Sequence, residues 1–121
     1  METINIFNSI LDTIKELLNI SNDDTVFNIE LIIHINSALS TLYELGVTKT
    51  PFRIKGEEET WDDLLGEETK LEDVKDYLYL RTKVVFDPPP SSYVLTCMKE
   101  MIKELEWRLN VKAEDAIEDG E

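Results

Sequence analysis

Apolar residues recur at steps of three and four along two segments in the first half of the chain, which is the spacing of one face of an α-helix. The first segment covers about residues 4–20. The second covers about residues 26–45, and Ile29 and Ile33 widen its main stripe of Phe27, Leu31, Ile35, Ala38, Leu39 and Leu42. Gly46 follows, at a position where helices commonly end in a left-handed residue. The pattern predicts two amphipathic helices.

The periodicity disappears between residues 47 and 59, where a single proline and a weak alternation favour an extended arm or a short strand. Thr60 then offers a capping hydroxyl. Asp62 and Asp63 place two acids in the turn that follows, a combination typical of the start of a helix. We expect a short helix that ends near Gly66.

Two further helices are predicted in the second half of the chain. The third covers about residues 70–86, with Tyr77 beside an inward stripe of Leu71, Val74, Leu78 and Val85. The fourth runs from the prolines to about residue 111, with an inward stripe of Val94, Met98, Met101, Ile102, Leu105 and Leu109. We expect these two helices to form an antiparallel hairpin.

The joint between these helices, residues 85–92, contains three consecutive prolines. Asp87 precedes the first of them, which disfavours the helical conformation and ends the third helix near Phe86. The prolines can enter the next helix, because its first N–H groups need no intrahelical acceptor. Asp87, Ser91 and Ser92 are all candidate N-caps. The joint is therefore predicted to be a short, stiff corner that reverses the chain.

The predicted fold is all-α, with four main helices and one long loop or arm between the second and third. A length of 121 residues supports one domain, which we assign to residues 1–112. Residues 113–121 hold five acids and little apolar surface, which predicts a flexible, disordered acidic tail. No apolar run approaches the roughly 18 residues of a membrane span. The N-terminus lacks the positive charges of a signal peptide, so we expect a soluble protein that stays where it is made.

Acidic residues outnumber basic ones by 26 to 12, for a formal net charge of −14. This balance disfavours binding to nucleic-acid phosphates and to anionic membranes. Residues 57–76 alone hold ten acids and two lysines. Two interpretations of this segment stay open. It is either a solvated loop kept soluble by charge, or the wall of a DNA passage in a ring-shaped oligomer, where repulsion keeps friction low.

The sequence offers no catalytic, cofactor-binding or metal-ligating residues, which predicts that the protein is not an enzyme. His34 is the one histidine and has no carboxylate near it at ligand spacing, so it is expected to be a structural or surface residue. Cys97 is the one cysteine, which rules out an internal disulfide, and it is expected to be buried or half-buried. The four glycines stand apart, so no phosphate-binding loop is present.

Five stretches in order along the chain carry a similarity to one known family. The strongest are residues 77–94, which include Asp87-Pro88-Pro89-Pro90-Ser91-Ser92, and residues 103–109, which include Glu106-Trp107-Arg108-Leu109. Weaker similarity lies at residues 31–47, 51–52 and 60–63. Together they resemble the head-tail connector (head-completion adaptor) proteins of tailed phages.

The resemblance implies a structural protein of a phage or prophage virion, made in the host cytoplasm and lacking catalytic residues. Such adaptors form a ring, typically of about a dozen subunits, under the portal protein, although the isolated subunit can be a monomer. The ring extends the channel that DNA passes without specific binding, and it docks the next connector or stopper protein. The family implies portal contact by the last helix, residues 93–111, or by the tail. It also implies a place near the channel for residues 47–66.

The net charge leaves an alternative, a small acidic inhibitor that mimics DNA and occupies a basic groove on a host enzyme. A mimic of this kind loses binding steeply as salt is added, whereas apolar docking loses less. The long apolar stripes and the stiff corner are not needed for mimicry, so the connector is the favoured interpretation.

Overall fold

The computed structural model describes residues 8–66 and 71–119, and within these ranges the chain is all-α, as predicted. Its helices are α1 (Ile10–Leu17), α2 (Asn28–Glu44), α3 (Trp61–Leu65), α4 (Leu71–Phe86) and α5 (Ser92–Asp119). No strand forms in the described residues. An isolated antiparallel bridge joins Ser9 to Thr60, next to the starts of α1 and α3.

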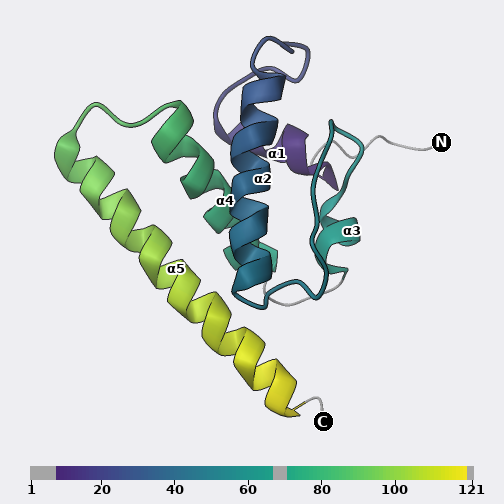
Figure 1. Ribbon diagram of the computed structural model, residues 1–121. Coiled ribbons are helices and arrows are strands. Elements are labelled where there is room, and N and C mark those ends of the chain that lie inside the picture. The colour runs from purple at the N-terminus through teal and green to yellow at the C-terminus, as the bar shows by residue number, and fades with distance from the viewer. Residues whose placement is uncertain (1–7, 67–70, 120–121) are drawn as a thin grey trace.

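Helices α2 and α4 form the centre of the molecule, and α5 packs against α4 after the chain reverses at the proline joint (Figure 1). The short helix α1 contacts both α2 and α4. Helix α3 and most of the preceding arm, residues 45–56, lie on the side of α2 away from α5 (Figure 1), but the arm leaves α2 at Leu45 and Gly46, which lie against α5. The expected antiparallel hairpin is therefore α4 followed by α5.

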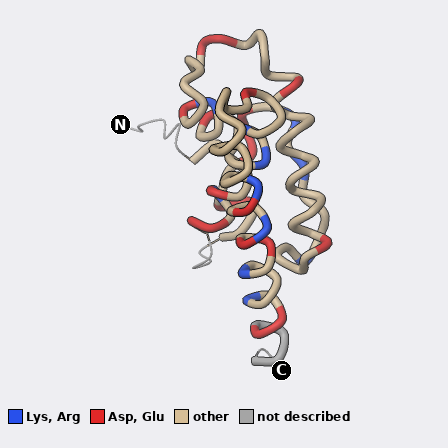
Figure 2. The backbone as a smooth tube through the Cα atoms, turned by 90° about the vertical axis from the view of Figure 1, so that its left-hand side faces the viewer, with Lys and Arg blue, Asp and Glu red and all other residues tan. Residues whose placement is uncertain are grey.

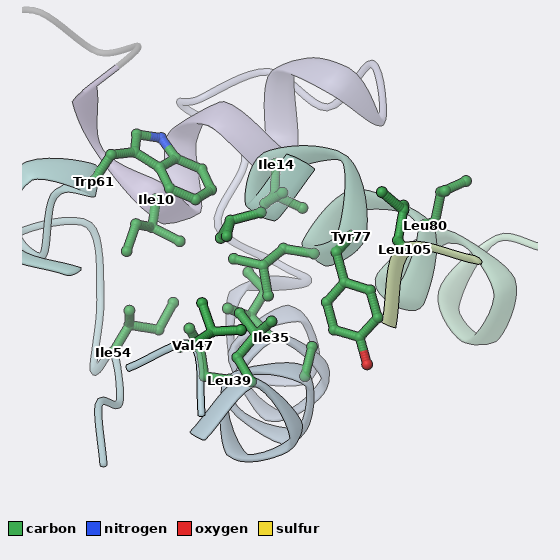
Figure 3. Close-up of a cluster of buried hydrophobic side chains, with 14 of the residues drawn as sticks. Ile10, Ile14, Ile35, Leu39, Val47, Ile54, Trp61, Tyr77, Leu80 and Leu105 are labelled. Carbon is green, nitrogen blue, oxygen red and sulfur yellow. The ribbon is translucent and has the colours of Figure 1, made fainter. Parts of the chain in front are cut away.

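The core gathers side chains from all five helices and from the arm (Figure 3). The residues labelled in the figure are Ile10, Ile14, Ile35, Leu39, Val47, Ile54, Trp61, Tyr77, Leu80 and Leu105. The indole of Trp61 is 1% exposed, and its Nε1 donates a hydrogen bond to Thr13 Oγ1 at 2.9 Å. Trp61 thus connects α3, and the arm that leads into it, to α1.

Local signals placed α2, α3 and α4 within two residues of their predicted ends. Thr60 caps α3: its hydroxyl accepts from Asp63 N at 3.0 Å, while Asp63 Oδ2 accepts from Thr60 N at 3.1 Å. Gly46 ends α2 with φ +85°, in the left-handed region where glycine has no Cβ penalty. The predicted ends of α2 and α3 are confirmed. They were predictable because each depends on residues close together in the chain.

The predicted limits of the first helix, about residues 4–20, are wrong in the described part. Helix α1 begins at Ile10, because Ser9 is its N-cap and accepts from Asp12 N at 3.2 Å. It ends at Leu17, and Asn19 follows with φ +65°. Residues 1–7 lie outside the described range.

The arm is extended but pairs with no strand, because the side chain of Asn36 takes the place of a neighbouring strand. Asn36 Nδ2 donates to Ile54 O at 3.0 Å, and Ile54 N donates to Asn36 Oδ1 at 2.8 Å. Asn36 and Ile54 are both buried. The carboxylate of Glu59 accepts from Lys55 N at 2.9 Å and from Gly56 N at 3.4 Å. The backbone of the arm is therefore held at four points.

Replacing Asn36 with alanine is expected to destabilise the fold by about 1–3 kcal/mol, because two buried backbone groups of Ile54 lose their partners. Urea denaturation measures the loss, and limited proteolysis should cut first within residues 45–56. Ser40→Ala, on the exposed side of the same helix, is the matched control and should change stability by less than about 0.5 kcal/mol. Equal stability of the two variants would contradict the role of Asn36.

At the joint, Ser91 is the N-cap of α5. Its Oγ accepts from Val94 N at 3.3 Å, and its carbonyl accepts from Leu95 N at 3.0 Å. The prolines precede the helix and do not enter it. Lys83 Nζ lies 2.9 Å from Asp87 Oδ2, a contact that spans the end of α4. Of the three candidate caps, the structure selects Ser91, which directly precedes the first helical residue, Ser92.

The expected end of the last helix near residue 111 is wrong, because α5 continues to Asp119. Ala113, assigned from sequence to the tail, is 4% exposed, and a Cβ at Gly46 would lie 3.5 Å from its Cβ. The close approach of α5 to the turn after α2 gives this part of the acidic segment a packing partner. The division of the chain at residue 112 and the flexibility of the tail stay predictions.

Candidate interaction surfaces

The described residues hold no group of three or more His, Cys, Asp or Glu side chains placed to bind a metal ion. His34 does have a nearby carboxylate, contrary to expectation, since its Nε2 lies 3.5 Å from Glu30 Oε2 one turn earlier. Cys97 was expected to be buried or half-buried and is exposed. Among the described helices, none combines the length and apolarity that a bilayer crossing requires. The surface features that remain are apolar faces and unpaired charges.

The outward face of α2 presents two exposed isoleucines among small polar residues and carries few charges of its own. Ile29 and Ile33, which were expected to turn inward, are 76% and 61% exposed. They lie one turn apart, opposite the buried positions Leu31, Ile35 and Leu39. No Asp, Glu, Lys or Arg lies between Glu30 and Glu44. An exposed face of this kind is typical of a protein–protein interface.

The first three turns of α5 contribute little to the core, with Met98 partly buried against it. None of residues 92–101 is buried, although Val94 and Met101 were expected to turn inward. Val85, at the end of α4, is likewise exposed. The edge-to-face contact of Phe86 with Phe27, with ring centroids 5.3 Å apart, joins this end of α4 to the start of α2. The joint and its flanking turns therefore form a protruding apolar elbow.

Tyr93 and Trp107 lie on the outward face of α5, opposite the buried Ile102, Leu105 and Leu109. They are 76% and 68% exposed and lie fourteen residues apart, which is close to four helical turns. Trp and Tyr are the residues that most often dominate binding energy at interfaces. In the sequence, the exposure of Trp107 is indicated by its position off the apolar stripe of its own helix.

A pocket of about 310 Å³ opens between α4 and α5. Its lining consists of Asp76, Tyr79, Leu80, Met101, Glu104, Leu105 and Arg108. Burial, with nearby Glu72 and Asp73, raises the pKa of Asp76 above its usual value. The pocket thus combines apolar side chains with two carboxylates and one guanidinium, a lining that suits a side chain of a partner protein.

The second half of α5 is fixed to the core by polar contacts. Asp73 of α4 lies 3.4 Å from Arg108 Nη1 and 3.0 Å from Lys112 Nζ. Asn110 Nδ2 donates to Leu45 O at 3.0 Å. The acids of residues 57–76 therefore do not all face solvent, because Asp73 serves this anchoring role. Glu67 and Glu68 lie outside the described residues.

Tyr77 connects α4 to α5 from inside the core. Its hydroxyl donates to Glu106 Oε2 at 2.7 Å and accepts from Arg81, which also reaches Thr41 Oγ1 at 3.1 Å and Ser37 Oγ at 3.2 Å. Burial, followed by the hydrogen bond to Glu106, raises the pKa of Tyr77 to about 12. The neutral phenol is therefore the form that the fold requires.

This pKa predicts a loss of stability in strong alkali. Below pH 10 both folded and unfolded states hold a neutral Tyr77, so its contribution is fully present. Between pH 10 and 12 the unfolded chain releases the proton and the folded chain retains it, which favours unfolding by about 2 kcal/mol at pH 12. Denaturation of the wild type and of Tyr77→Phe across this range measures the effect. The variant should lack this part of the slope, and parallel curves would contradict the assignment.

The exposed cations of the described chain are concentrated in the arm. Six Lys or Arg residues of the described chain are exposed, and Lys103 and Lys112 of these form ion pairs. Of the four without an ion pair, Lys99 lies on α5 and the other three in the arm, namely Lys49, Arg53 and Lys55. Sequence reasoning missed this surface, although a stretch of net charge +3 in a chain of −14 was its signal.

Comparison with known proteins identifies a family for this chain. The family model described as "Phage connector protein" matches residues 10–116. The chain belongs to this phage connector family. The resemblance to head-tail connectors is therefore confirmed, and the family is one of phage structural connector proteins. No curated protein sequence and no solved structure shows a significant match to it. The connector family gives no support to the alternative of a DNA-mimicking inhibitor.

Proposed function

We propose that this connector protein is a head-tail adaptor, which assembles as a ring under the portal, extends the DNA channel and docks the next tail component. The observation that carries the proposal is the family match, which spans every described helix except the last residues of α5. On this proposal the protein acts in the virion, without catalysis, and its ring contains about a dozen copies.

The exposed surfaces support separate docking roles. The outward face of α5, with Tyr93 and Trp107, is the better candidate for the portal, because it presents large aromatic anchors on a helix fixed by Asp73 and Tyr77. The outward face of α2 remains for a neighbouring subunit or the next component. Apolar faces of this length are not expected on a protein that acts alone.

The acidic residues of α3 and its flanks support a place beside the channel. Glu57, Glu58, Asp62 and Asp63 are exposed, and the described chain offers none of them an ion-pair partner. A surface of this charge repels phosphates and so cannot hold passing DNA. On the proposal, these acids face the channel.

The test is electron microscopy of assembled particles together with a pull-down on purified portal protein. We expect a ring of this chain between portal and tail, and retention of the chain by portal in moderate salt. A monomer in free solution is compatible with the proposal. Absence of the chain from particles, together with no binding to portal, would refute it.

A further inference from the structure

We propose that the basic arm of one copy binds the acidic C-terminal end of α5 of a second copy, and that this contact joins neighbouring subunits. The arm is residues 45–56, and the acidic end is the exposed pair Glu114 and Asp115. This inference rests on the proposed ring, since it names the contact by which one copy meets the next.

The arm is built to present cations. Ile54 is buried and fixed to Asn36 through both of its backbone groups. The neighbours of a buried residue in an extended chain point the opposite way, so Arg53 and Lys55 face solvent. The carboxylate of Glu59 binds the backbone N–H groups of Lys55 and Gly56, and neither Arg53 nor Lys55 forms an ion pair with a described residue, although Glu57 and Glu58 follow closely in the chain. A fixed backbone lowers the entropy that a partner must overcome on binding.

The acidic end is placed to reach another molecule. Helix α5 runs past Ala113, the last buried residue that the structure describes on it, and this part of the helix extends beyond the other elements in both views (Figures 1 and 2). Figure 2 shows acidic positions at this end, below the last basic ones. Residues 113–121 carry five acids and no Lys or Arg. Glu114 and Asp115 are exposed and form no ion pair with any described residue.

The two surfaces are complementary in charge, and no ion pair joins Lys49, Arg53 or Lys55 to Glu114 or Asp115 within the described chain, although the start of the arm lies against α5 at Gly46. The helix leads its acids away from the body, while the arm is held against α2 through Asn36 (Figure 1). A contact between two different surfaces of identical chains is heterologous, and when repeated it closes into a ring or continues as a filament. A second copy is therefore the occupant that both the charges and the direction of α5 favour.

Cross-linking between two single-cysteine chains tests the contact. In a Cys97→Ser background, one full-length chain carries Arg53→Cys and the other Asp115→Cys, and they are mixed with and without portal protein. A covalent heterodimer is expected, and it should decrease by about tenfold when salt rises from low to well above physiological strength. Absence of the heterodimer both with and without portal would overturn the inference. A third chain that carries both cysteines would also overturn it if its cross-link formed only within one molecule.

Charge reversal gives a second readout. Arg53→Glu/Lys55→Glu and Glu114→Lys/Asp115→Lys should each weaken self-association by about tenfold or more, and their combination in one chain should restore it to within about threefold. Lys99→Glu/Lys103→Glu, with the same change in net charge, is the control and should shift it less than about twofold. A general effect of charge, seen equally in the control, would contradict the assignment.

These results separate the inference from the proposed function. The arm variants keep the outward face of α5 and should still be retained by portal. If portal retains the protein but the arm of one copy does not cross-link to the acidic end of another, the inference alone is overturned. A cross-link in a chain that neither binds portal nor enters particles overturns the proposed function alone.

Discussion

Replacing Trp61 with alanine is expected to cost about 3–5 kcal/mol of folding free energy, a large part of the 5–15 kcal/mol typical of a domain. The indole is 1% exposed, lies beside Ile10 in the core (Figure 3), and donates to Thr13 Oγ1 at 2.9 Å. Its removal leaves a cavity at the point where α3 meets α1. Thermal denaturation should show a fall of about 10–20 °C in Tm.

Trp61→Phe separates the two causes, because phenylalanine fills most of the cavity but cannot donate to Thr13. It should recover more than half of the lost stability. The matched control is the second tryptophan, since Trp107→Ala removes the same side chain from an exposed position and should change stability by less than about 0.5 kcal/mol. Equal losses at the two sites would contradict the described packing.

Trp107→Ala is expected to weaken portal binding by about 30-fold or more, because a central aromatic anchor commonly contributes at least 2 kcal/mol to an interface. The side chain is 68% exposed in the isolated subunit and lies on the same face of α5 as Tyr93. The physical reason is that docking removes this large apolar area from water. Affinity measured on purified portal, by calorimetry or by a titrated pull-down, gives the result.

Two controls define the outcome. Trp107→Phe should retain most of the affinity, because the ring still fills the site, and Lys99→Ala should bind within about threefold of the wild type. Denaturation must show that Trp107→Ala is folded. Unchanged portal binding by the folded variant would assign the portal contact to another surface, and the outward face of α2, with Ile29 and Ile33, would be next to test.

Predictions from local sequence were accurate where the cause lies within a few residues. The capping box of Thr60 and Asp63 and the left-handed Gly46 each depend on backbone groups next to them in the chain. The proline joint is of the same kind, although only the structure chose Ser91 as the cap. Such signals are readable because their partners are fixed by chain connectivity.

Predictions of burial failed at the edges of the helical stripes. Ile29, Ile33 and Val94 were assigned inward because they extend an apolar pattern, yet each is exposed. Periodicity tells which residues share a face, but not how much of that face another helix covers. On the proposed function, the uncovered part of an apolar face is available for a partner, so these positions are the candidate interfaces.

The sequence by itself determined the helical composition, the place of the reversing joint, the acidic charge and the similarity to phage connectors. Only the tertiary structure showed that Asn36 fixes the arm through Ile54, that α5 continues beyond Ala113, and that Trp61 and Trp107 have opposite environments. These features depend on contacts between residues far apart in the chain, whose meeting is decided by how the helices pack. The proline joint between α4 and α5 was therefore predictable from local sequence. The exposed faces beside it, which we propose as docking surfaces, depend on how the helices pack.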